Sequence, residues 1–238
     1  MDTCECRPVP VAEFVSLSQR GDSMSIRVFL ADDHSIVRDS LSTLLNSVDD
    51  FTVVGGAANG REAVAEVQRL KPDVVLMDIA MPELNGIGAT DQICGAGLET
   101  RVIILSVHFS IDHVSMALKT GARGYLLKRS ESSEVIDAIR AVHAGDFYLS
   151  REITGAVIKE YILQGCARTE SPVCKLTARD REILQMVAEG KSNAGIAEIL
   201  GITKTSVEVY RSRLMKKLGI KDPASLLRLA VQSGLTTL

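Results

Sequence analysis

The feature of this 238-residue chain that most limits its fold is an alternation of strand-like and helix-like segments between residues 26 and 145. Short strand-like segments alternate with stretches in which apolar residues recur at helical spacing. The strand-like segments are 26–32, 51–57, 73–78, 101–106 and 124–128. All but the second and fifth are nearly continuous apolar runs, which is typical of parallel strands covered on both faces. This pattern predicts an α/β domain with a doubly wound, five-stranded parallel sheet and right-handed crossovers.

Acidic residues end two of these segments. The first ends in Asp32 and Asp33, and the third ends in Asp78. Sheets of this class bind ligands beyond the carboxyl ends of their strands. If the first and third strands are neighbours, three carboxylates meet there, and their repulsion would raise their pKa values unless a cation lies among them. Carboxylate oxygens suit a hard divalent cation, Mg²⁺ above all.

Two other segments end in residues that complement this acidic group. The fourth ends in Ser106, a hydroxyl donor, and the fifth ends in Lys128, a positive charge. Any one of the three acids alone would more often be a solvated loop acid or a helix N-cap. Together with a metal, the acids and the residues Ser106 and Lys128 can stabilise a phosphoryl group during transfer, with Asp78 as the nucleophile. The sequence therefore predicts a site that accepts a phosphoryl group.

In these residues and their order, the segment 26–145 resembles the receiver domain of two-component response regulators, which has a flavodoxin-like fold. The resemblance implies that Asp78 is the phosphorylated aspartate. It also implies metal ligands and switch residues. The Mg²⁺ ligands would be Asp33 and Asp78 directly, Asp32 through water and Ala80 through its backbone carbonyl. The residues that respond to the phosphoryl group would be Lys128, the hydroxyl of Ser106 and the aromatic ring of Tyr125, which turns inward. Ala80 and His108 would flank the path of the attacking water.

The charge of the chain is divided unevenly along its length. Residues 24–148 hold 11 Lys and Arg against 17 Asp and Glu, whereas residues 175–238 hold 11 against 6. An acidic body joined to a small basic domain indicates that the basic domain contacts a polyanion.

The basic end of the chain reads as a set of short, capped helices. A helix over 150–163 is followed by a linker over 164–174, which contains Gly165 and Pro172. Four further helices are expected after it. Their predicted caps are Thr177 with Asp180 three residues on, Ser192, Thr203, and the pair Asp222–Pro223. A short helix, a four-residue turn and a longer basic helix predict a helix-turn-helix over about 192–211.

The third of these helices has two different faces. Val207, Leu214 and Leu218 form its expected buried stripe. The opposite face, which we expect to contact DNA, carries Lys204, Thr205, Glu208, Val209, Ser212, Arg213 and Lys216. The segment resembles the LuxR-type helix-turn-helix in "LTARDREIL", "EGKSN", "IAEILGI" and "TSVEVYRSRLMKKLGI". It departs from that family at Gly195, where a mid-helix glycine costs about 1 kcal/mol against alanine, and at Glu208, where many relatives are basic.

Both resemblances together make the chain similar to a response regulator of the NarL/FixJ type. The expected domains are an N-terminal extension over 1–23, a receiver over 24–148, a helix and linker over 149–174, and a DNA-binding domain over 175–238. The resemblance implies a cytoplasmic protein that is not a turnover enzyme. Its expected partners are a sensor histidine kinase, double-stranded promoter DNA and a second copy of the chain after phosphorylation, with RNA polymerase as a further candidate. Before phosphorylation, we expect the receiver to mask residues 203–216.

Three other functions are alternatives to this one. An aspartyl-phosphate hydrolase usually has a second aspartate two residues after its nucleophile, where this chain has Ala80. A quorum sensor would need an aromatic-lined pocket, and the chain has no Trp. A receiver that acts through protein contacts independently of phosphorylation stays open as the alternative.

The first residues and the cysteines carry weaker signals. The opening stretch has acids where a signal peptide has positive charge, so we expect a disordered extension, and Met24 is an alternative start. No apolar run approaches the roughly 18 residues of a membrane span. The five scattered cysteines read as reduced thiols.

Overall fold

The computed structural model describes residues 25–107, 109–164, 176–220 and 222–232. The expected N-terminal extension, His108 and residues 165–174 of the expected linker lie outside these ranges. Among the described residues, no helix is both long and apolar enough to cross a bilayer.

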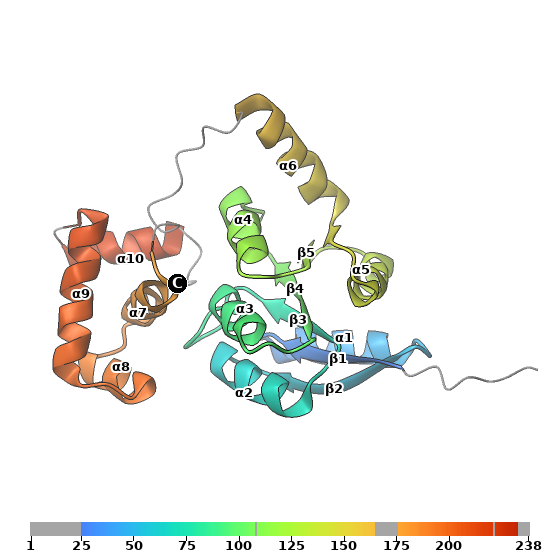
Figure 1. Ribbon diagram of the computed structural model, residues 1–238, viewed down its shortest axis with the longest axis horizontal. Helices are drawn as coiled ribbons and strands as arrows, with labels where there is room; N and C mark the ends of the chain where they lie inside the picture. Colours follow the sequence, from blue (N-terminus) through green and yellow to red (C-terminus); the bar gives the residue numbers. More distant parts are fainter. Residues whose placement is uncertain (1–24, 108, 165–175, 221, 233–238) are drawn as a thin grey trace, which may run out of the picture.

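A parallel sheet forms the centre of the N-terminal α/β domain (Figure 1). The strands are β1 (Ile26–Ala31), β2 (Phe51–Ala57), β3 (Val74–Asp78), β4 (Arg101–Ser106), β5 (Gly124–Leu127) and β6 (Tyr148–Leu149). Their order across the sheet is β2-β1-β3-β4-β5-β6. The first and third strands are therefore neighbours, which is the condition that the acidic site required.

The prediction of five strands was wrong by one. In the sixth strand, Tyr148 pairs with Gly124 and Leu149 pairs with Tyr125, parallel to β5. A strand of two residues is too short to show any periodicity, so the sequence pattern could not indicate it.

Five helices cover the two faces of the sheet. They are α1 (Ser35–Asn46), α2 (Gly60–Leu70), α3 (Gly86–Gly95), α4 (Ile111–Lys119) and α5 (Ser132–Ala144). The helices α1 and α5 lie on one face, and α2, α3 and α4 lie on the other (Figure 1). Because successive strand residues point to opposite faces, each strand serves two cores. Leu30 and Leu76 pack in the same core as Leu45 of α1, whereas Phe29 and Met77 pack with the helices of the other face.

The remaining helices lie C-terminal to the sheet. They are α6 (Arg151–Gln164), α7 (Ala178–Ala188), α8 (Asn193–Leu200), α9 (Lys204–Leu218) and α10 (Pro223–Gln232). Thr177, Ser192 and Thr203 cap α7, α8 and α9 as predicted, and Thr177 forms a full capping box with Asp180. The helices α8 and α9 meet in the predicted helix-turn-helix, with a core that includes Ile196 and Val207.

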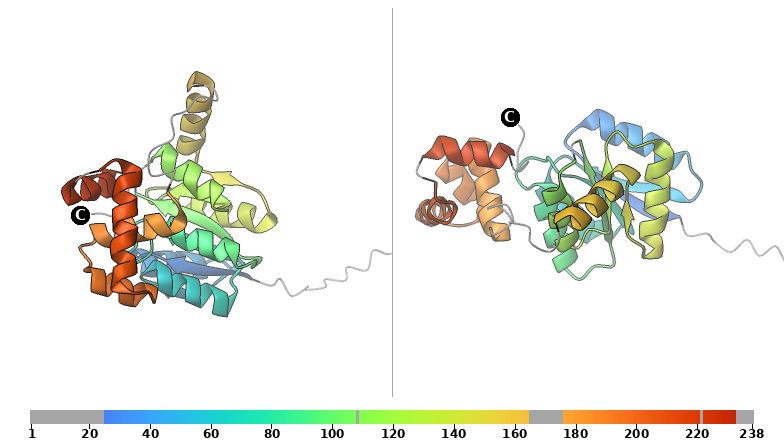
Figure 2. Two further views of the ribbon diagram at one scale, coloured as in Figure 1. Left: turned by 60° about the vertical axis from the view of Figure 1, so that its left-hand side comes forward. Right: turned by 90° about the horizontal axis from the view of Figure 1, so that it is seen from above.

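The helical domain contacts the α/β domain through α7. This helix lies next to α3, whereas α9 lies on the side away from the sheet (Figures 1 and 2). The apolar core is continuous between the two, because Leu184 of α7 belongs to the same cluster as Leu84 and Ile87 of the α/β domain. This placement fixes which surfaces of each domain stay open.

Candidate functional site

The three predicted acids meet at the carboxyl edge of the sheet. β1 and β3 run side by side with Ala31 opposite Met77, so Asp32, which follows β1, lies next to Asp78, the last residue of β3. Both of these side chains are 2% exposed. Asp33 lies further out, with its side chain 34% exposed. The structure thus brings together the carboxylates that the sequence placed in one site.

Lys128 reaches into this group from the end of β5. Its Nζ lies 2.7 Å from Oδ2 of Asp32 and 3.0 Å from Oδ2 of Asp78. The Lys128 backbone N–H donates to the carbonyl of Ser106, at the end of β4. The residues predicted from four different strand ends therefore form one cluster.

Burial controls the acidity of Asp78. Desolvation is the largest influence and raises its pKa, and the charges of Asp32 and Asp33 act in the same direction. The Lys128 ammonium opposes them by attraction and by its hydrogen bond. Burial also disfavours the charge of Lys128, but hydrogen bonds and attraction from Asp32 and Asp78 outweigh it and raise the pKa of Lys128. The site lacks positive charge for its three acids, which is the condition that favours a bound cation.

His34 is a member of the site that sequence reasoning missed. Its Nδ1 lies 2.7 Å from Oδ1 of Asp33 and 3.2 Å from Oδ1 of Asp32. Ligand atoms of Asp32, Asp33, His34 and Asp78 all lie within 4.8 Å of one another. The signal was present in the run "ADDH", but adjacency alone does not say that a histidine turns back over the acids.

The donor set fits a hard divalent cation. Three carboxylates supply the oxygen ligands that Mg²⁺ uses in proteins. Ala80 lies two residues after Asp78 in the loop before α3 and is partly exposed. The backbone of this loop is closed by hydrogen bonds from Met81 and Gly86 to the carbonyl of Ile79.

Ser106 and Tyr125, the two predicted switch residues, lie on neighbouring strands. Ser106 is 6% exposed and Tyr125 is fully buried, so the aromatic ring already takes the inward position. The pKa of Tyr125 is raised to about 12, chiefly by burial and also by the charge of Asp78, against a lowering effect of the Ser106 hydroxyl. The phenol oxygen nevertheless makes no hydrogen bond of ordinary geometry.

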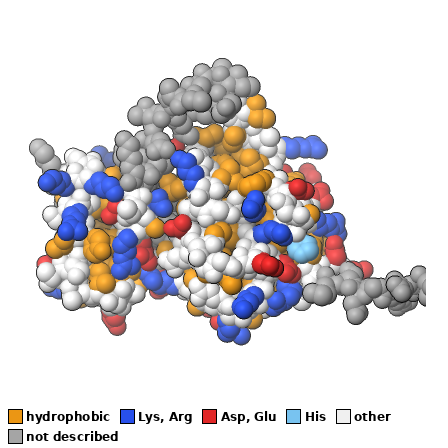
Figure 3. All heavy atoms as spheres, viewed as in Figure 1, with side chains coloured by type: hydrophobic (Ala, Val, Ile, Leu, Met, Phe, Trp, Pro, Cys, Tyr) orange, Lys and Arg blue, Asp and Glu red, His pale blue; other side chains and the backbone are white. Residues whose placement is uncertain are grey.

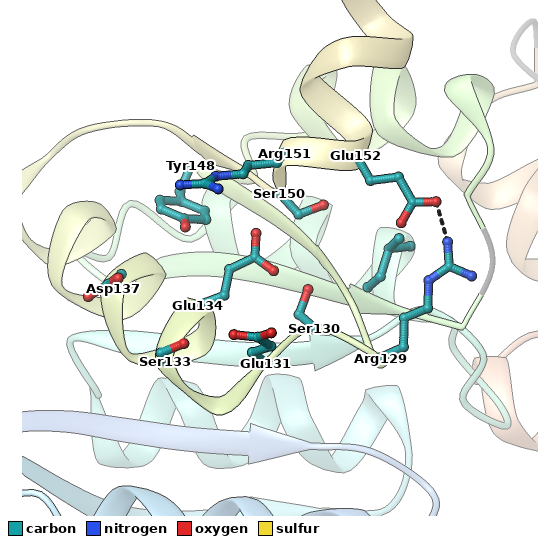
Figure 4. Close-up of a pocket in the computed structure, with 11 residues that line it drawn as sticks. Arg129, Ser130, Glu131, Ser133, Glu134, Asp137, Tyr148, Ser150, Arg151 and Glu152 are labelled. Carbon is teal, nitrogen blue, oxygen red and sulfur yellow. Dashed lines mark hydrogen bonds and ion pairs between the residues drawn. The ribbon is translucent and has the colours of Figure 1, made fainter.

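The start of α6 is tied to β5 and to the residue after Lys128. The Ser150 N–H donates to the carbonyl of Tyr125, and Arg129 forms an ion pair with Glu152. Figure 4 shows this pair at one side of a polar pocket between β6, α5 and the first turn of α6. The pocket's lining carries both signs of charge and lies apart from the acidic cluster. Hydrophobic side chains are visible between α4 and α6 in Figure 3, and Ile153 of α6 is fully buried.

The predicted DNA-facing side of α9 is open. Val207 and Leu214 are buried as predicted, and Arg211 is held by a hydrogen bond to Asn193 of α8. All seven predicted contact residues are exposed: Lys204, Thr205, Glu208, Val209, Ser212, Arg213 and Lys216.

The expectation that the receiver masks residues 203–216 was wrong for this structure. The α/β domain does pack against the helical domain, but it does so through α7. Gln185 hydrogen-bonds Met81 and Asn85 in the loop before α3. Arg61 of α2 pairs with Glu182. The contact uses polar side chains of α7, which sequence analysis did not assign, together with the apolar cluster around Leu184, and it leaves α9 uncovered.

A buried acid–lysine cluster at the carboxyl edge of a doubly wound parallel sheet, joined to a helix-turn-helix, is the architecture expected of a receiver domain followed by a DNA-binding domain. Comparisons with known proteins agree. Residues 28–140 match the response regulator receiver domain, and residues 174–230 match the bacterial regulatory proteins of the luxR family. The chain is 36% identical over 214 residues to the oxygen regulatory protein NreC of Staphylococcus aureus (strain bovine RF122 / ET3-1), covering 88% of this chain and 99% of NreC. It therefore belongs to the DNA-binding response regulators of two-component systems, with a receiver domain and a LuxR-type DNA-binding domain.

Solved structures share this fold. A two-component response regulator of the LuxR family from Aurantimonas sp. SI85-9A1 is 33% identical, with a TM-score of 0.56, over 58% of this chain and 99% of that one. RcsB from Salmonella enterica serovar Typhimurium, bound to promoter P1flhDC in the presence of phosphomimetic BeF3-, has a TM-score of 0.60 at 21% identity, over 87% of this chain and 99% of RcsB. At that identity the second likeness concerns the fold alone.

Proposed function

We propose that a sensor histidine kinase phosphorylates Asp78 and that this changes how the chain binds promoter DNA. The observation that carries the proposal is the pairing of buried Asp78 with Lys128, 3.0 Å from it, beside Asp32 and Asp33. An oxygen of Asp78 attacks the phosphorus atom, the bond from phosphorus to the kinase histidine breaks, and the freed imidazole nitrogen takes up a proton. Lys128 stabilises negative charge on the phosphoryl oxygens.

Asp33 and Asp78 would hold Mg²⁺ directly, Asp32 would hold it through water, and Ala80 would contribute its carbonyl. When bound, the cation neutralises charge on the transferring group. After transfer, the Ser106 hydroxyl would bond a phosphoryl oxygen, and Tyr125 would stay inward behind it. The chain would keep the phosphoryl group as a signal and lose it slowly, so it would not be a turnover enzyme.

On DNA, the exposed face of α9 would enter the major groove. Lys204, Arg213 and Lys216 would contact phosphates, and Thr205 would lie at the start of the helix. Glu208, Val209 and Ser212 would face the base edges. The charge of the domain and the exposure of these side chains support this assignment.

A single helix-turn-helix covers one half-site, so phosphorylation would favour a homodimer. The receiver would comprise residues 24–148 and the DNA-binding domain residues 175–238, with the helix and linker over 149–174 between them and an extension over 1–23. The protein would act in the cytoplasm, where promoter DNA and RNA polymerase, a further candidate partner, are found. The alternative is a receiver that acts by protein contacts without phosphorylation.

The test is phosphoryl uptake from acetyl phosphate in the presence of Mg²⁺, measured by intact mass. The wild-type protein should gain one acid-stable, base-labile phosphoryl group, and Asp78→Asn should gain none. Lys128→Ala should take it up about a hundredfold more slowly, because one electrostatic stabiliser of the transferring group is lost. Asp137→Asn, at an exposed acid of α5, is the matched control and should behave as wild type. Uptake that persists in Asp78→Asn would refute the site. DNA binding that is the same before and after uptake would favour the alternative.

A further inference from the structure

One buried side chain of the DNA-binding domain is hydrogen-bonded to the backbone of the loop that follows Asp78. Gln185 of α7 is 1% exposed. Its Oε1 accepts a hydrogen bond from the backbone N–H of Asn85 at 2.8 Å, and its Nε2 donates to the carbonyl of Met81 at 2.8 Å. Its Nε2 also donates to Glu189 at 2.7 Å. Both amide protons and the amide oxygen of this side chain therefore have partners, and two of the three partners are backbone groups of the other domain.

The loop that Gln185 holds, residues 79–85, follows Asp78 directly and contains Ala80. It is compact, because Met81 and Gly86 both donate to the carbonyl of Ile79. No side chain would fit at Gly86, where an added Cβ would lie 2.0 Å from the carbonyl oxygen of Asp78. The loop's own turn leaves the Met81 carbonyl and the Asn85 N–H to be satisfied from outside. Buried backbone groups need such partners, and here both partners are one side chain of α7.

Neighbouring contacts hold α7 against the same loop. The carboxylate of Glu189 accepts from the N–H of Glu83, with oxygens at 3.2 and 3.4 Å. Glu83 has a φ of 66°, in the left-handed region. Arg61 of α2 forms an ion pair with Glu182, which is 7% exposed. Two side chains of α7, together with its C-cap residue Glu189, therefore contact the loop or the helix beside it.

We propose that Gln185 is a positioning residue of the phosphorylation site: by fixing residues 81 and 85 of the loop 79–85, it holds the adjoining Ala80 so that its carbonyl is set for the metal. This inference rests on the proposed metal site. Some groups orient a metal ligand without touching the metal, and their removal often changes metal affinity by tenfold or more. The coupling is reciprocal, so a bound metal also strengthens the contact between the loop and α7. Because α9 stays exposed, this link acts on the site itself rather than by covering the DNA-facing side chains.

The test compares Mg²⁺ binding to the full-length protein and to Gln185→Met by isothermal titration calorimetry. Methionine keeps the length and helix propensity of the side chain but loses both hydrogen bonds to the loop and the one to Glu189. We expect the Mg²⁺ dissociation constant to rise about tenfold. Gln68→Met, the same change at an exposed position of α2, should leave the constant unchanged.

Hydrogen exchange supplies a local readout of the same link. In the wild-type protein, Mg²⁺ should slow exchange in a peptide covering residues 79–86, because the Asn85 N–H is held by Gln185. In Gln185→Met this slowing should be lost, whereas exchange in β4 should not differ between the two proteins. A generally loosened fold would raise exchange in both segments.

A second variant weakens the contact between α7 and the α/β domain by a change in the α/β domain. Arg61→Met removes the ion pair to Glu182 without touching the loop, and it should weaken Mg²⁺ binding in the same direction as Gln185→Met, though less. If circular dichroism shows that Gln185→Met does not fold, Arg61→Met becomes the variant that tests the role of α7 in Mg²⁺ binding. Wild-type Mg²⁺ affinity in a folded Gln185→Met, or in Arg61→Met if the first variant is unfolded, would overturn the role of α7 and leave the metal site intact. A wild-type protein that binds no Mg²⁺ would overturn the metal site itself, and this inference with it.

Discussion

The ammonium of Lys128 lies 3.0 Å from a carboxylate oxygen of Asp78, at the end of a strand two places away in the sheet. The pair is buried, with the side chains 13% and 2% exposed. The same lysine also pairs with Asp32. One cation therefore serves two buried acids, and Asp78 keeps a raised pKa in spite of it.

This imbalance predicts how stability depends on pH in the absence of metal. Because burial raises the pKa of Asp78 above its unfolded value, its contribution to stability is present below the unfolded pKa and is lost as pH rises through the folded pKa. Asp78→Asn cannot titrate, so its free energy of unfolding relative to wild type should increase from acidic to neutral pH. Urea unfolding in EDTA at several pH values measures the difference. A pH-independent difference would show that Asp78 has the same pKa in both states.

Magnesium should stabilise the wild-type protein by relieving the repulsion among Asp32, Asp33 and Asp78. A ligand that binds only the folded state adds about 2.7 kcal/mol at a hundred times its dissociation constant, which would appear as a higher Tm in a thermal scan. Asp33→Ala should lose most of this increase. Asp39→Ala, at an exposed acid on α1, should keep it. A Tm that does not respond to Mg²⁺ in the wild-type protein would contradict the shared metal site.

On the open face of α9, the residues proposed to contact phosphates and those proposed to contact bases should have different effects on DNA binding when they are replaced. Lys216→Ala should reduce the slope of log affinity against log salt by about one per subunit, because one phosphate contact is lost. Glu208→Ala should change the preferred sequence more than the affinity, since a carboxylate can accept from a cytosine amino group. Selection from a random DNA pool, together with titrations at several salt concentrations, measures both. If Lys216→Ala changes the preference and Glu208→Ala does not, the helix enters the groove on a different face.

Gly195 offers a stability test that is independent of the phosphorylation site. It lies inside α8, and an added Cβ would lie no closer than 3.6 Å to the Ser192 hydroxyl, an ordinary contact. Gly195→Ala should therefore stabilise the DNA-binding domain by about 0.5–1 kcal/mol. Denaturant unfolding followed by circular dichroism measures the change. A loss of stability would mean that α8 needs its glycine for a close approach that this structure does not contain.

The parts of the structure that could be predicted are those in which one physical rule acts over many residues. Buried parallel strands appear in the sequence as apolar runs. The carboxyl ends of such strands lie at one edge of the sheet, so the topology places Asp32, Asp78 and Lys128 together. Helix caps such as Thr203 are equally local. The predicted roles of these residues, in contrast, stay predictions until the site is tested chemically.

The features that were missed depend on contacts that no periodicity records. β6 has only two residues. His34 joins the acids through the direction of one side chain. Gln185 looks like a solvent-facing residue of an amphipathic helix, and its burial arises only because a loop about a hundred residues earlier leaves two backbone groups unpaired. The predicted masking of α9 failed for the same reason, because the docking face was decided by α7.

The open face of α9 has a consequence for how such a regulator finds its target. A basic surface that is open, as it is in this structure, is drawn to the DNA backbone, and weak, salt-sensitive attachment allows sliding and hopping along the duplex. The search can therefore be under way before any signal arrives. Under the proposed mechanism, phosphorylation would then act on how long a molecule stays at the right sequence, by favouring a second copy of the chain on the DNA, and not on the first encounter.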